Sequence, residues 1–488
     1  MTQEDALKIL KAGHNVYLTG APGSGKTYLL NEYIRFLKKK RIFVGVTAST
    51  GIAATHLGGF TIHSWAGIGI EREMSDAEVK LIAAKRRVVK RFAQAKTLII
   101  DEISMLDADR LDLIDRVARA ARGSPGPFGG IQTVFCGDFF QLPPITKEGE
   151  LPPRFAYHSS VWEQMNLKIC YLHEQHRQGD EKFIQVLNAI RQNNVSEVIK
   201  SRLCARRGKD PVIGRITKLY SHNINVDEEN ARELARLSGK EMLYEMEELG
   251  IRAILESLKK GCLAPERLVI KQRAKVMFIK NNFDKGFVNG TLGEVAGFDD
   301  SGFPIVVTFN GDKIIASPET WSIEENGRAL AKITQVPLRL AWAITVHKSQ
   351  GMTLDAVEID LSGAFEKGMG YVALSRVRSL AGINLLGFND IALQVHPEIL
   401  EFDNALKESS ERAMRELGEL SKEKHSKVYS VAEIRESHPS AYQKWLPEED
   451  EKLISGFKSG IAIRSLVSVL GRRTGAIFSR LRKLKLIE

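Results

Sequence analysis

The sequence predicts an α/β protein in which helices cover both faces of a parallel sheet. The first observation is an alternation of helical stretches with strand-like runs that are apolar almost throughout, as strands buried on both faces are. These runs are VYLTG at 16–20, RIFVGVTAS at 41–49, KTLIIDE at 96–102 and IQTVFCGD at 131–138. The second observation is a glycine-rich motif directly after the first run, and the third is another α/β region that begins near Tyr171.

The glycine-rich segment GAPGSGKT at 20–27 matches the pattern G-x-x-x-x-G-K-[ST] of a phosphate-binding loop. Its glycines let consecutive N–H groups turn toward one point, and the following helix adds partial positive charge there. Lysine is expected to reach the β- and γ-phosphates and threonine to hold Mg²⁺. The alternative, an accidental glycine-rich turn, is disfavoured by the preceding strand. The expected ATP- or GTP-binding residues are Gly20, Gly23, Ser24, Gly25, Lys26 and Thr27.

The bulk composition agrees with an intracellular protein that meets a polyanion. The 488 residues carry 70 basic and 60 acidic side chains, a formal charge of +10 and a pI near 9.2, and this balance weakly favours nucleic acid as a partner. The four cysteines are far apart, so neither a disulfide framework nor structural zinc is expected. With no signal peptide or membrane-spanning run evident, we expect a cytoplasmic location and no membrane partner.

Two adjacent carboxylates end the strand-like run at 97–100, where open α/β sheets bind ligands. Asp101 is the expected Mg²⁺ partner and Glu102 the expected general base for nucleotide hydrolysis. Such pairs also occur in ordinary surface turns, but seldom behind a buried strand. The sequence therefore predicts an NTP hydrolase.

GDFFQLPPI, at 137–145, ends the next strand-like run. Gln141 is placed to sense a γ-phosphate or the attacking water, while Phe140 and Pro143 could offer an apolar surface on which bases stack. Core packing is the simpler role for one of the two phenylalanines, Phe139 or Phe140, and we expect it for one but not both.

Two arginines in the second α/β region are candidates to complete the site from another domain. Arg177 lies in HEQHRQ and Arg376 in YVALSRVRS. An arginine delivered across a domain boundary stabilises charge on the transferring phosphoryl group and makes hydrolysis depend on closure. An isolated arginine more often forms an ion pair, and only the context raises these two above that.

Several polar residues after strand-like runs are candidate DNA contacts. TASTGIAATHLGGFTIHSW offers Thr50, Thr61, His63 and Ser64, and WAITVHKSQG offers His347 and Lys348. His63 could equally be a structural histidine. The basic helix within 70–92 is either a solvated face or a contact for phosphates, and the sequence does not decide between them.

The remainder of the chain reads as an insertion, a linker and a small helical domain. Short strands between about 268 and 317, separated by Gly, Asn, Asp and Pro, suggest a small antiparallel barrel. After His396 comes a charged helical linker, and from Trp445 three short helices with a helix-turn-helix core. DNA contact through Arg472, Arg473 and Arg480 is preferred here over a protein-docking role.

Together these motifs resemble the PIF-type helicases of superfamily 1B, a family related to RecD. The likeness runs from about Gln3 to Phe388, and its most diagnostic stretch is DEISMLDADRLDLIDRVARAARGSPGPFGGIQTVFCGDFFQLPP at 101–144. WAITVHKSQGMTLD and YVALSRVRS match equally well. The resemblance implies an ATP-dependent DNA helicase that moves 5′ to 3′ on single strands and acts on duplexes, with G-quadruplexes, forks and RNA–DNA hybrids as plausible substrates.

The resemblance also implies an architecture of two RecA-like P-loop lobes, a wedge insertion and an inserted SH3-like β-barrel. The chain departs from the family after about residue 395, and its tail from Trp445 resembles a helix-turn-helix-like or Myb-like domain instead. By the same analogy Gln3 would read the adenine edge and Gly351 would lie near the γ-phosphate. We expect the enzyme to work as a monomer. The implied boundaries are 1–65 and 93–170 for lobe 1, 66–92 for the wedge, 171–225 and 332–395 for lobe 2, 226–331 for the insertion, 396–440 for the linker and 441–488 for the last domain.

Two other functions stay open at this point. One is a nucleic-acid translocase or remodeller that does not separate strands. The other is a helix-turn-helix regulator that uses nucleotide as a switch, against which Gln141, Arg177 and Arg376 argue, because a switch needs no motor residues spread over two lobes.

Overall fold

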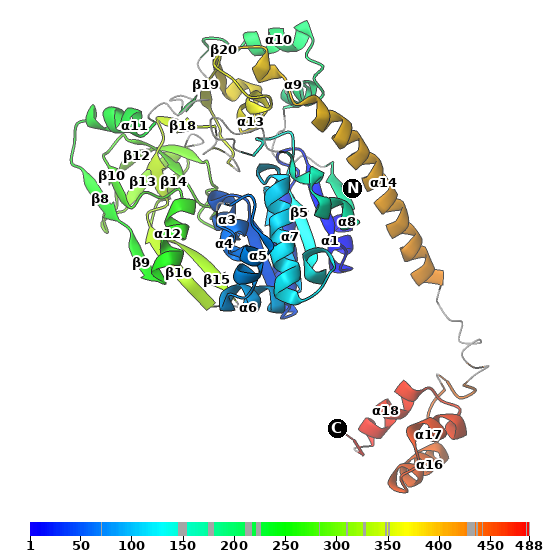
Figure 1. Cartoon of the computed structure of the whole chain (residues 1–488). Coiled ribbons are helices and arrows are strands. Elements are labelled where there is room, and N and C mark those ends of the chain that lie inside the picture. Colours follow the sequence, from blue (N-terminus) through cyan, green and yellow to red (C-terminus); the bar gives the residue numbers. More distant parts are fainter. Residues whose placement is uncertain are drawn as a thin grey trace. The chain divides into compact units, whose positions relative to one another are not determined.

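The chain, shown as a ribbon in Figure 1, divides into two compact units, 1–414 and 415–488, each described by itself. The computed structural model describes residues 1–69, 71–144, 154–173, 180–209, 217–220, 226–282, 284–308, 311–325, 328–346, 349, 352–426, 435, 438–441, 443–484 and 486–487. No helix among these residues has the length and apolar character needed to cross a membrane.

Lobe 1 is a parallel six-stranded sheet in the order β3-β2-β4-β5-β1-β6. Its strands are β1 (Val16–Gly20), β2 (Val44–Ala48), β3 (Phe60–Thr61), β4 (Thr97–Asp101), β5 (Gln132–Cys136) and β6 (Lys168–Leu172). Every residue of β1 and β4 is buried, as the apolar runs predict for strands covered on both faces.

Several helices of lobe 1 begin or end at capping residues of the sequence. Asp107 accepts from the N–H of Arg110 at the start of α7, and Gly123 ends that helix with φ of +60°. The helices are α1 (Gln3–Lys11), α2 (Lys26–Lys39), α3 (Gly51–His56), α4 (Ile62–Ala66), α5 (Asp76–Ala83), α6 (Arg86–Gln94), α7 (Ala108–Arg122) and α8 (Ser160–Gln164).

Two boundaries differ from the sequence-based expectation. Strand β6 pairs with β1 over its whole length, so Tyr171 and Leu172 belong to lobe 1 and not to the start of lobe 2. The region 66–92, expected as a separate wedge, contains α5 and most of α6, and both helices pack against α7. Val79 and Phe92 are part of the same hydrophobic core as the sheet. This region is therefore built onto lobe 1.

Lobe 2 is a parallel four-stranded sheet in the order β18-β7-β19-β20. Its strands are β7 (Thr217–Tyr220), β18 (Ala343–Thr345), β19 (Val357–Leu361) and β20 (Ile383–Phe388). Its helices are α9 (Glu181–Arg191), α10 (Glu197–Cys204), α11 (Val226–Ala235) and α13 (Met369–Ser375). Two separate parallel sheets confirm the α/β class.

Between β7 and β18 lies an insertion made mostly of antiparallel strands, as the short runs punctuated by Gly, Asn and Asp predict. Five strands pair in the order β14-β13-β12-β11-β17, three in the order β15-β16-β9, and β8 pairs with β10. The strands are β8 (Met242–Glu245), β9 (Glu247–Gly250), β10 (Arg267–Ile270), β11 (Lys275–Phe278), β12 (Leu292–Phe298), β13 (Pro304–Thr308), β14 (Lys313–Ile315), β15 (Glu319–Glu325), β16 (Arg328–Gln335) and β17 (Leu338–Leu340). Helix α12 (Arg252–Gly261) packs against α3 of lobe 1.

The C-terminal part begins with the long helix α14 (Pro397–Ser426), within the region expected to be a helical linker. The second unit contains α16 (Pro447–Lys458), α17 (Ile463–Leu470) and α18 (Thr474–Lys483). Leu453, Leu466, Leu470, Ile477 and Leu481 form its core, and Gly471 ends α17 with φ of +58°. The three-helix arrangement and its core agree with the sequence-based prediction.

Candidate active site and nucleic-acid contacts

The loop between β1 and α2 has the backbone of a phosphate cradle. Gly23 and Gly25 take φ values of +85° and +84°, which L side chains rarely adopt. A Cβ on Gly20 would lie 2.6 Å from the Leu172 carbonyl oxygen, so glycine is required there for space as well. The first-turn N–H groups of α2 are left for a ligand, and Thr27 lies exposed in that turn.

Three side chains in and beside this loop fit a bound triphosphate. The Lys26 ammonium donates to the carbonyl oxygens of Gly20 at 2.7 Å and Ala21 at 3.2 Å, and burial lowers its pKa. The buried Ser24 hydroxyl has no hydrogen-bond partner in the described part of the chain. A phosphate would stabilise the charge of Lys26 and give Ser24 Oγ an acceptor. Gln3 donates from Nε2 to the Ser24 carbonyl oxygen at 3.3 Å, which places the start of α1 at the cradle.

The two carboxylates lie at the end of β4, as predicted. Asp101 is buried, and its Oδ1 accepts from the N–H of Glu102 at 2.9 Å. Burial, and then the neighbouring charge of Asp101, raise the pKa of Glu102 to about 7, and burial also raises the pKa of Asp101. Glu102 has φ of +51°, a strained conformation for this residue that is held by the hydrogen bond from Ser49 Oγ to its carbonyl oxygen. A carboxylate with a pKa near neutrality suits a general base.

A hydrogen bond between the lobes closes the site. Arg376, at the end of α13 in lobe 2, donates from Nη2 to Oε1 of Gln141 in lobe 1 at 2.9 Å. Both side chains are buried, and burial lowers the pKa of Arg376 while Glu102 raises it. The structure therefore brings Lys26, Glu102 and Arg376 into one electrostatic neighbourhood.

Both phenylalanines after β5 are buried, so the expectation that only one would be is wrong. Phe139 packs edge-on against Tyr157 and lies near Trp162. Phe140 is 2% exposed, with the Arg191 guanidinium 3.9 Å from its ring centre. Because that face is taken, Phe140 has no surface for stacking a base here, whereas Pro143 is partly exposed.

The predicted DNA contacts of lobe 1 follow β2 and β3, and some of them also form hydrogen bonds within lobe 1. The hydroxyls of Thr50 and Thr61 cap α3 and α4 by accepting from the N–H groups of Ala53 and Ser64. His63 is partly buried, and burial lowers its pKa to about 4, so it is neutral at physiological pH. Their contact with DNA stays a prediction. Arg177, His347, Lys348 and Gly351 lie outside the described residues.

Known proteins with similar sequences identify the family of this chain. The sequence pattern described as PIF1-like helicase matches residues 3–201, and that of the DNA helicase Pif1 2B domain matches 253–298. The ATP-dependent DNA helicase Pif1 of Psychrobacter sp. (strain PRwf-1) is 44% identical over 483 residues, covering 87% of this chain and 73% of that protein. The chain belongs to the PIF1-like helicase family.

Solved structures agree with this assignment to a family of ATP-dependent DNA helicases. Pif1 from Bacteroides sp. in complex with ADP-AlF4 is 32% identical, with a TM-score of 0.70 over 83% of this chain and 96% of that one. Pif1 from Bacteroides with ADP-AlF3 and ssDNA is 31% identical, with a TM-score of 0.56 over the same shares. The chain spans 62–65% of the lengths of the human, Xenopus laevis, Danio rerio and yeast helicases that it also matches.

One residue of this PIF1-like helicase that sequence reasoning missed is Arg191, at the end of α9. It is 7% exposed, and its Nη1 donates to Asp138 Oδ2 and to the Tyr371 hydroxyl, each at 2.9 Å. Its Nη2 donates to the Tyr171 hydroxyl at 3.1 Å and lies 3.4 Å from Asp403 of α14. Arg191 thus joins the loop that carries Gln141 to the helix that ends at Arg376. The one available signal is its place four residues after Leu187, on the apolar side of α9.

Most of the predicted C-terminal DNA contacts of this PIF1-like helicase form ion pairs within their own unit. Arg472 is 2% exposed and donates twice to Glu449 and also to the carbonyl oxygens of Gln443 and Lys444, so the prediction that it contacts DNA is wrong. Arg480 donates to both carboxylate oxygens of Asp450, which neutralises its charge. Arg473 is exposed, and its DNA contact stays a prediction.

Glu102→Gln in this PIF1-like helicase is expected to bind ATP normally but to hydrolyse it about 10²–10⁴-fold more slowly, because an amide cannot accept the proton of the attacking water. Binding of a fluorescent ATP analogue and single-turnover hydrolysis measure the two effects. Asp112→Asn is the matched control, since Asp112 caps α8 through the N–H groups of Ser160 and Val161. Equal loss of ATP binding and hydrolysis in Glu102→Gln would contradict the base assignment.

Proposed function

We propose that this chain couples ATP hydrolysis to 5′-to-3′ movement along single-stranded DNA and thereby separates duplexes, and that it acts on G-quadruplexes and RNA–DNA hybrids as well. The observation that supports coupling is the hydrogen bond between Arg376 and Gln141, because it joins the two lobes at the nucleotide site. Cleavage of the γ-phosphate at this point changes the contacts that hold the lobes together. The single-stranded DNA in a Bacteroides relative supports the partner.

The residues take the following roles in this proposal. The loop N–H groups, Ser24 and Lys26 bind the phosphates, and Gln3 contacts the adenine edge. Thr27 and Asp101 would hold Mg²⁺, which neutralises phosphate charge when bound. Glu102 orients and deprotonates the attacking water, and Arg376 and Arg177 stabilise the charge that develops on the phosphoryl group.

DNA contacts are assigned to the loops that end the strands of both lobes. On lobe 1 these are Thr50, Thr61, His63, Ser64 and Pro143, and on lobe 2 His347 and Lys348, whereas Gly351 is assigned to the γ-phosphate. The five-stranded antiparallel sheet of the insertion is assigned as an SH3-like barrel, and the second unit as a helix-turn-helix-like or Myb-like domain that contacts DNA through Arg473. The protein is proposed to act as a monomer in the cytoplasm.

The test measures ATP hydrolysis and strand separation side by side on 5′-tailed, 3′-tailed and quadruplex-bearing oligonucleotides. The expected result is hydrolysis that rises steeply with added single-stranded DNA, and separation of 5′-tailed substrates only. Separation from 3′ tails alone would contradict the polarity. Movement without separation, seen as displacement of streptavidin from a biotinylated strand, would leave a translocase, and hydrolysis indifferent to DNA would contradict the motor itself.

A further inference from the structure

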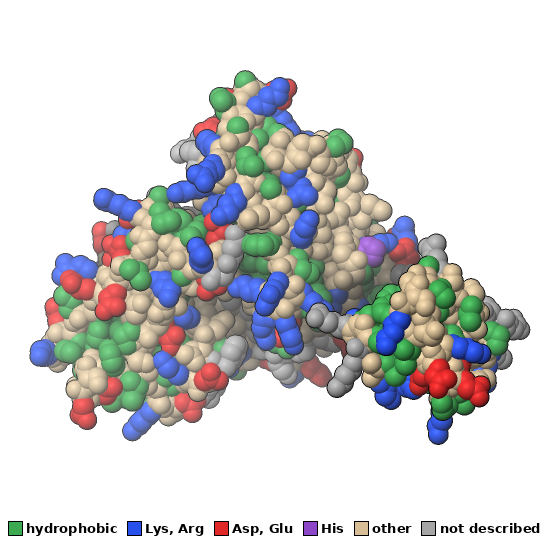
Figure 2. All heavy atoms as spheres, turned by 90° about the horizontal axis from the view of Figure 1, so that it is seen from below, with side chains coloured by type: hydrophobic (Ala, Val, Ile, Leu, Met, Phe, Trp, Pro, Cys, Tyr) green, Lys and Arg blue, Asp and Glu red, His purple; other side chains and the backbone are tan. Residues whose placement is uncertain are grey.

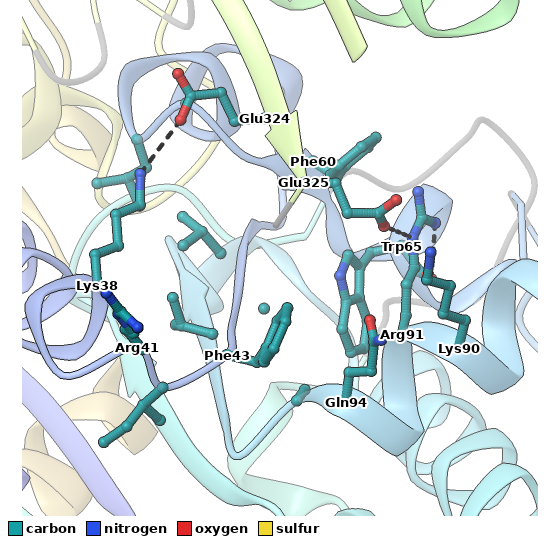
Figure 3. A pocket seen from close by; sticks show the side chains of 17 residues that line it. Lys38, Arg41, Phe43, Phe60, Trp65, Lys90, Arg91, Gln94, Glu324 and Glu325 are labelled. Carbon is teal, nitrogen blue, oxygen red and sulfur yellow. Dashed lines mark hydrogen bonds and ion pairs between the residues drawn. The ribbon is translucent and has the colours of Figure 1, made fainter. Parts of the chain in front are cut away.

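A cavity of about 530 Å³ opens at the edge of the lobe 1 sheet, apart from the nucleotide site (Figure 3). It is bounded by the N-terminal half of β2, the last turn of α6 and the end of β15 from the insertion. In Figure 3 the Phe43 ring lies between Lys38 and Arg41 on one side and Trp65, Arg91 and Lys90 on the other. None of these residues belongs to the ATP site described above.

The cavity exists because the sheet edge is incompletely covered. Strand β3 pairs only with Thr47 and Ala48, the last two residues of β2, so the edge of Val44–Val46 faces the cavity. The lack of a side chain at Gly45 makes room for the Trp65 indole, because a Cβ there would lie 2.7 Å from Trp65 Cζ2. Thr50, the first predicted contact for the tracked DNA strand, follows the opposite end of β2, roughly 20 Å from Val44 at the usual rise of a strand.

The charges around the cavity favour an anionic ligand. Its two carboxylates are already paired, Glu324 with Lys38 at 3.4 Å and Glu325 with Arg91 at 2.7 Å. Arg41 and Lys90, which also line the cavity, make no ion pair with any residue that the structure describes. Further exposed cations stand at the end of α2 and at the start of α6: Lys39, Lys40, Lys85, Arg86 and Arg87. Figure 2, seen from the side on which α6 lies in Figure 1, shows Lys and Arg side chains on this underside.

The aromatic lining adds a surface for a flat, apolar group. Phe43 is 41% exposed, unusually high for a phenylalanine beside a sheet, and its ring lines the open part of the cavity. The Phe60 ring does not offer an open face to a ligand, because the Arg91 guanidinium lies 4.5 Å from its ring centre. A single exposed ring flanked by unpaired cations is the arrangement with which proteins stack a base and hold its phosphates.

We propose that this cavity, the β2-edge cavity, binds a segment of single-stranded DNA, with one base against Phe43 and the adjoining phosphates on Arg41 and Lys90. The inference rests on the proposed function, since it takes DNA as the ligand. The segment comes either from an extension of the tracked strand around lobe 1 or from the displaced strand of a fork. The basic side of α6, whose role the sequence leaves open, then serves as a contact for phosphates. An acidic peptide with an aromatic residue is the competing occupant, and the test includes it.

The test uses the full chain and fluorescein-labelled probes read by anisotropy. Oligothymidylates of about 8 and about 30 nucleotides, within and above the ~4–16 nucleotides that a single binding domain usually covers, are compared with fork duplexes that carry or lack a displaced 3′ arm. The variants are Phe43→Ala and the double variant Arg41→Ala/Lys90→Ala. The matched control is Lys182→Ala/Lys313→Ala, which removes two exposed cations on α9 and β14. Phe43→Tyr, which keeps an aromatic ring, serves as the rescue variant.

Phe43→Ala is expected to bind about 5- to 100-fold more weakly, because stacking of one base on an aromatic ring raises affinity by about that factor. Phe43→Tyr is expected to recover the affinity. The double variant is expected to weaken binding and to lower its salt dependence. If affinity for the longer oligothymidylate falls, the tracked strand occupies the cavity. If affinity falls only for forks with a 3′ arm, the displaced strand occupies it. On the short oligothymidylate, DNA-stimulated hydrolysis should stay unchanged in both variants, which shows an intact motor and a folded protein.

Wild-type affinity of Phe43→Ala and of the double variant for every probe would overturn the proposal. So would a Glu-rich peptide with one phenylalanine that binds wild type but not Phe43→Ala, while DNA binding is equal in the two proteins. Either outcome leaves the proposed function standing, because DNA-stimulated hydrolysis and strand separation are measured separately on the wild-type protein.

Discussion

Replacing Lys26 by alanine is expected to lower ATP hydrolysis by about 10²–10³-fold or more, the cost of removing one preorganised donor from developing charge. The part-buried Lys26 ammonium donates to the carbonyl oxygens of Gly20 and Ala21, and removal from water lowers its pKa. A triphosphate supplies the negative charge that this site lacks, so the lysine contributes to binding as well as to hydrolysis. Single-turnover hydrolysis at saturating single-stranded DNA, with ATP affinity measured separately, checks the expectation.

The control for this substitution is Lys26→Arg, which keeps the positive charge but not the compact ammonium. We expect it to recover part of the ATP binding and little of the hydrolysis. Thermal unfolding should change little in either variant, because the folded protein loses no ion pair. Full DNA-stimulated hydrolysis in Lys26→Ala would contradict the assignment of the loop as the catalytic phosphate site.

Replacing Arg376 by alanine is expected to slow hydrolysis by about 10³–10⁵-fold, the range over which an arginine that stabilises the transferring phosphoryl group acts. Its guanidinium is buried and lies in the field of Glu102, and its Nη2 donates to Gln141 from the other lobe. The substitution should therefore also uncouple hydrolysis from DNA binding. Hydrolysis with and without single-stranded DNA, at saturating ATP, measures both effects.

Arg378→Ala is the matched control, two residues further along the chain. Its guanidinium is half-exposed and pairs with Asp355 at 3.2 Å, and a surface pair of this kind contributes about 0–1 kcal/mol. Hydrolysis should therefore stay close to wild type. A double-mutant cycle with Gln141→Ala separates the contact between the lobes from the action of Arg376 on phosphate. Equal, small losses in Arg376→Ala and Arg378→Ala would remove Arg376 from the catalytic set.

Much of the fold could be predicted because its signals are local. Apolar runs identified β1, β2, β4 and β5, and short strands between Gly and Asn identified the insertion. The expected boundary at 170/171 cuts through β6 because KICYL has the composition of any buried strand, and only its pairing with β1 shows that Tyr171 and Leu172 belong to lobe 1. The two-residue strand β3 is too short to give a period, and its shortness is what leaves the β2-edge cavity open.

The site residues that could be predicted lie in continuous motifs, and those that could not have partners far away in the sequence. Lys26, Asp101 and Glu102 stand in continuous motifs, because a phosphate cradle and a strand end need neighbouring residues in a set order. Arg191 has no such motif, since its partners Asp138, Tyr371 and Asp403 come from elements far apart in the sequence. The burial of both Phe139 and Phe140 also depends on distant groups, among them Tyr157 and Arg191.

The sequence by itself determined the nucleotide chemistry and the family of this protein, because backbone turns, strand ends and helix starts are specified by residues next to one another. Only the tertiary structure decided which charges remain available to ligands. Arg472 and Arg480 lie in a basic segment that suggests DNA contact, but they form ion pairs with Glu449 and Asp450. Arg41 belongs to no motif, and the sequence leaves open whether Lys90 faces solvent or a phosphate, yet both line an aromatic cavity. Whether a cation is neutralised depends on what folding brings within a few ångströms of it, and the order of residues does not contain that distance.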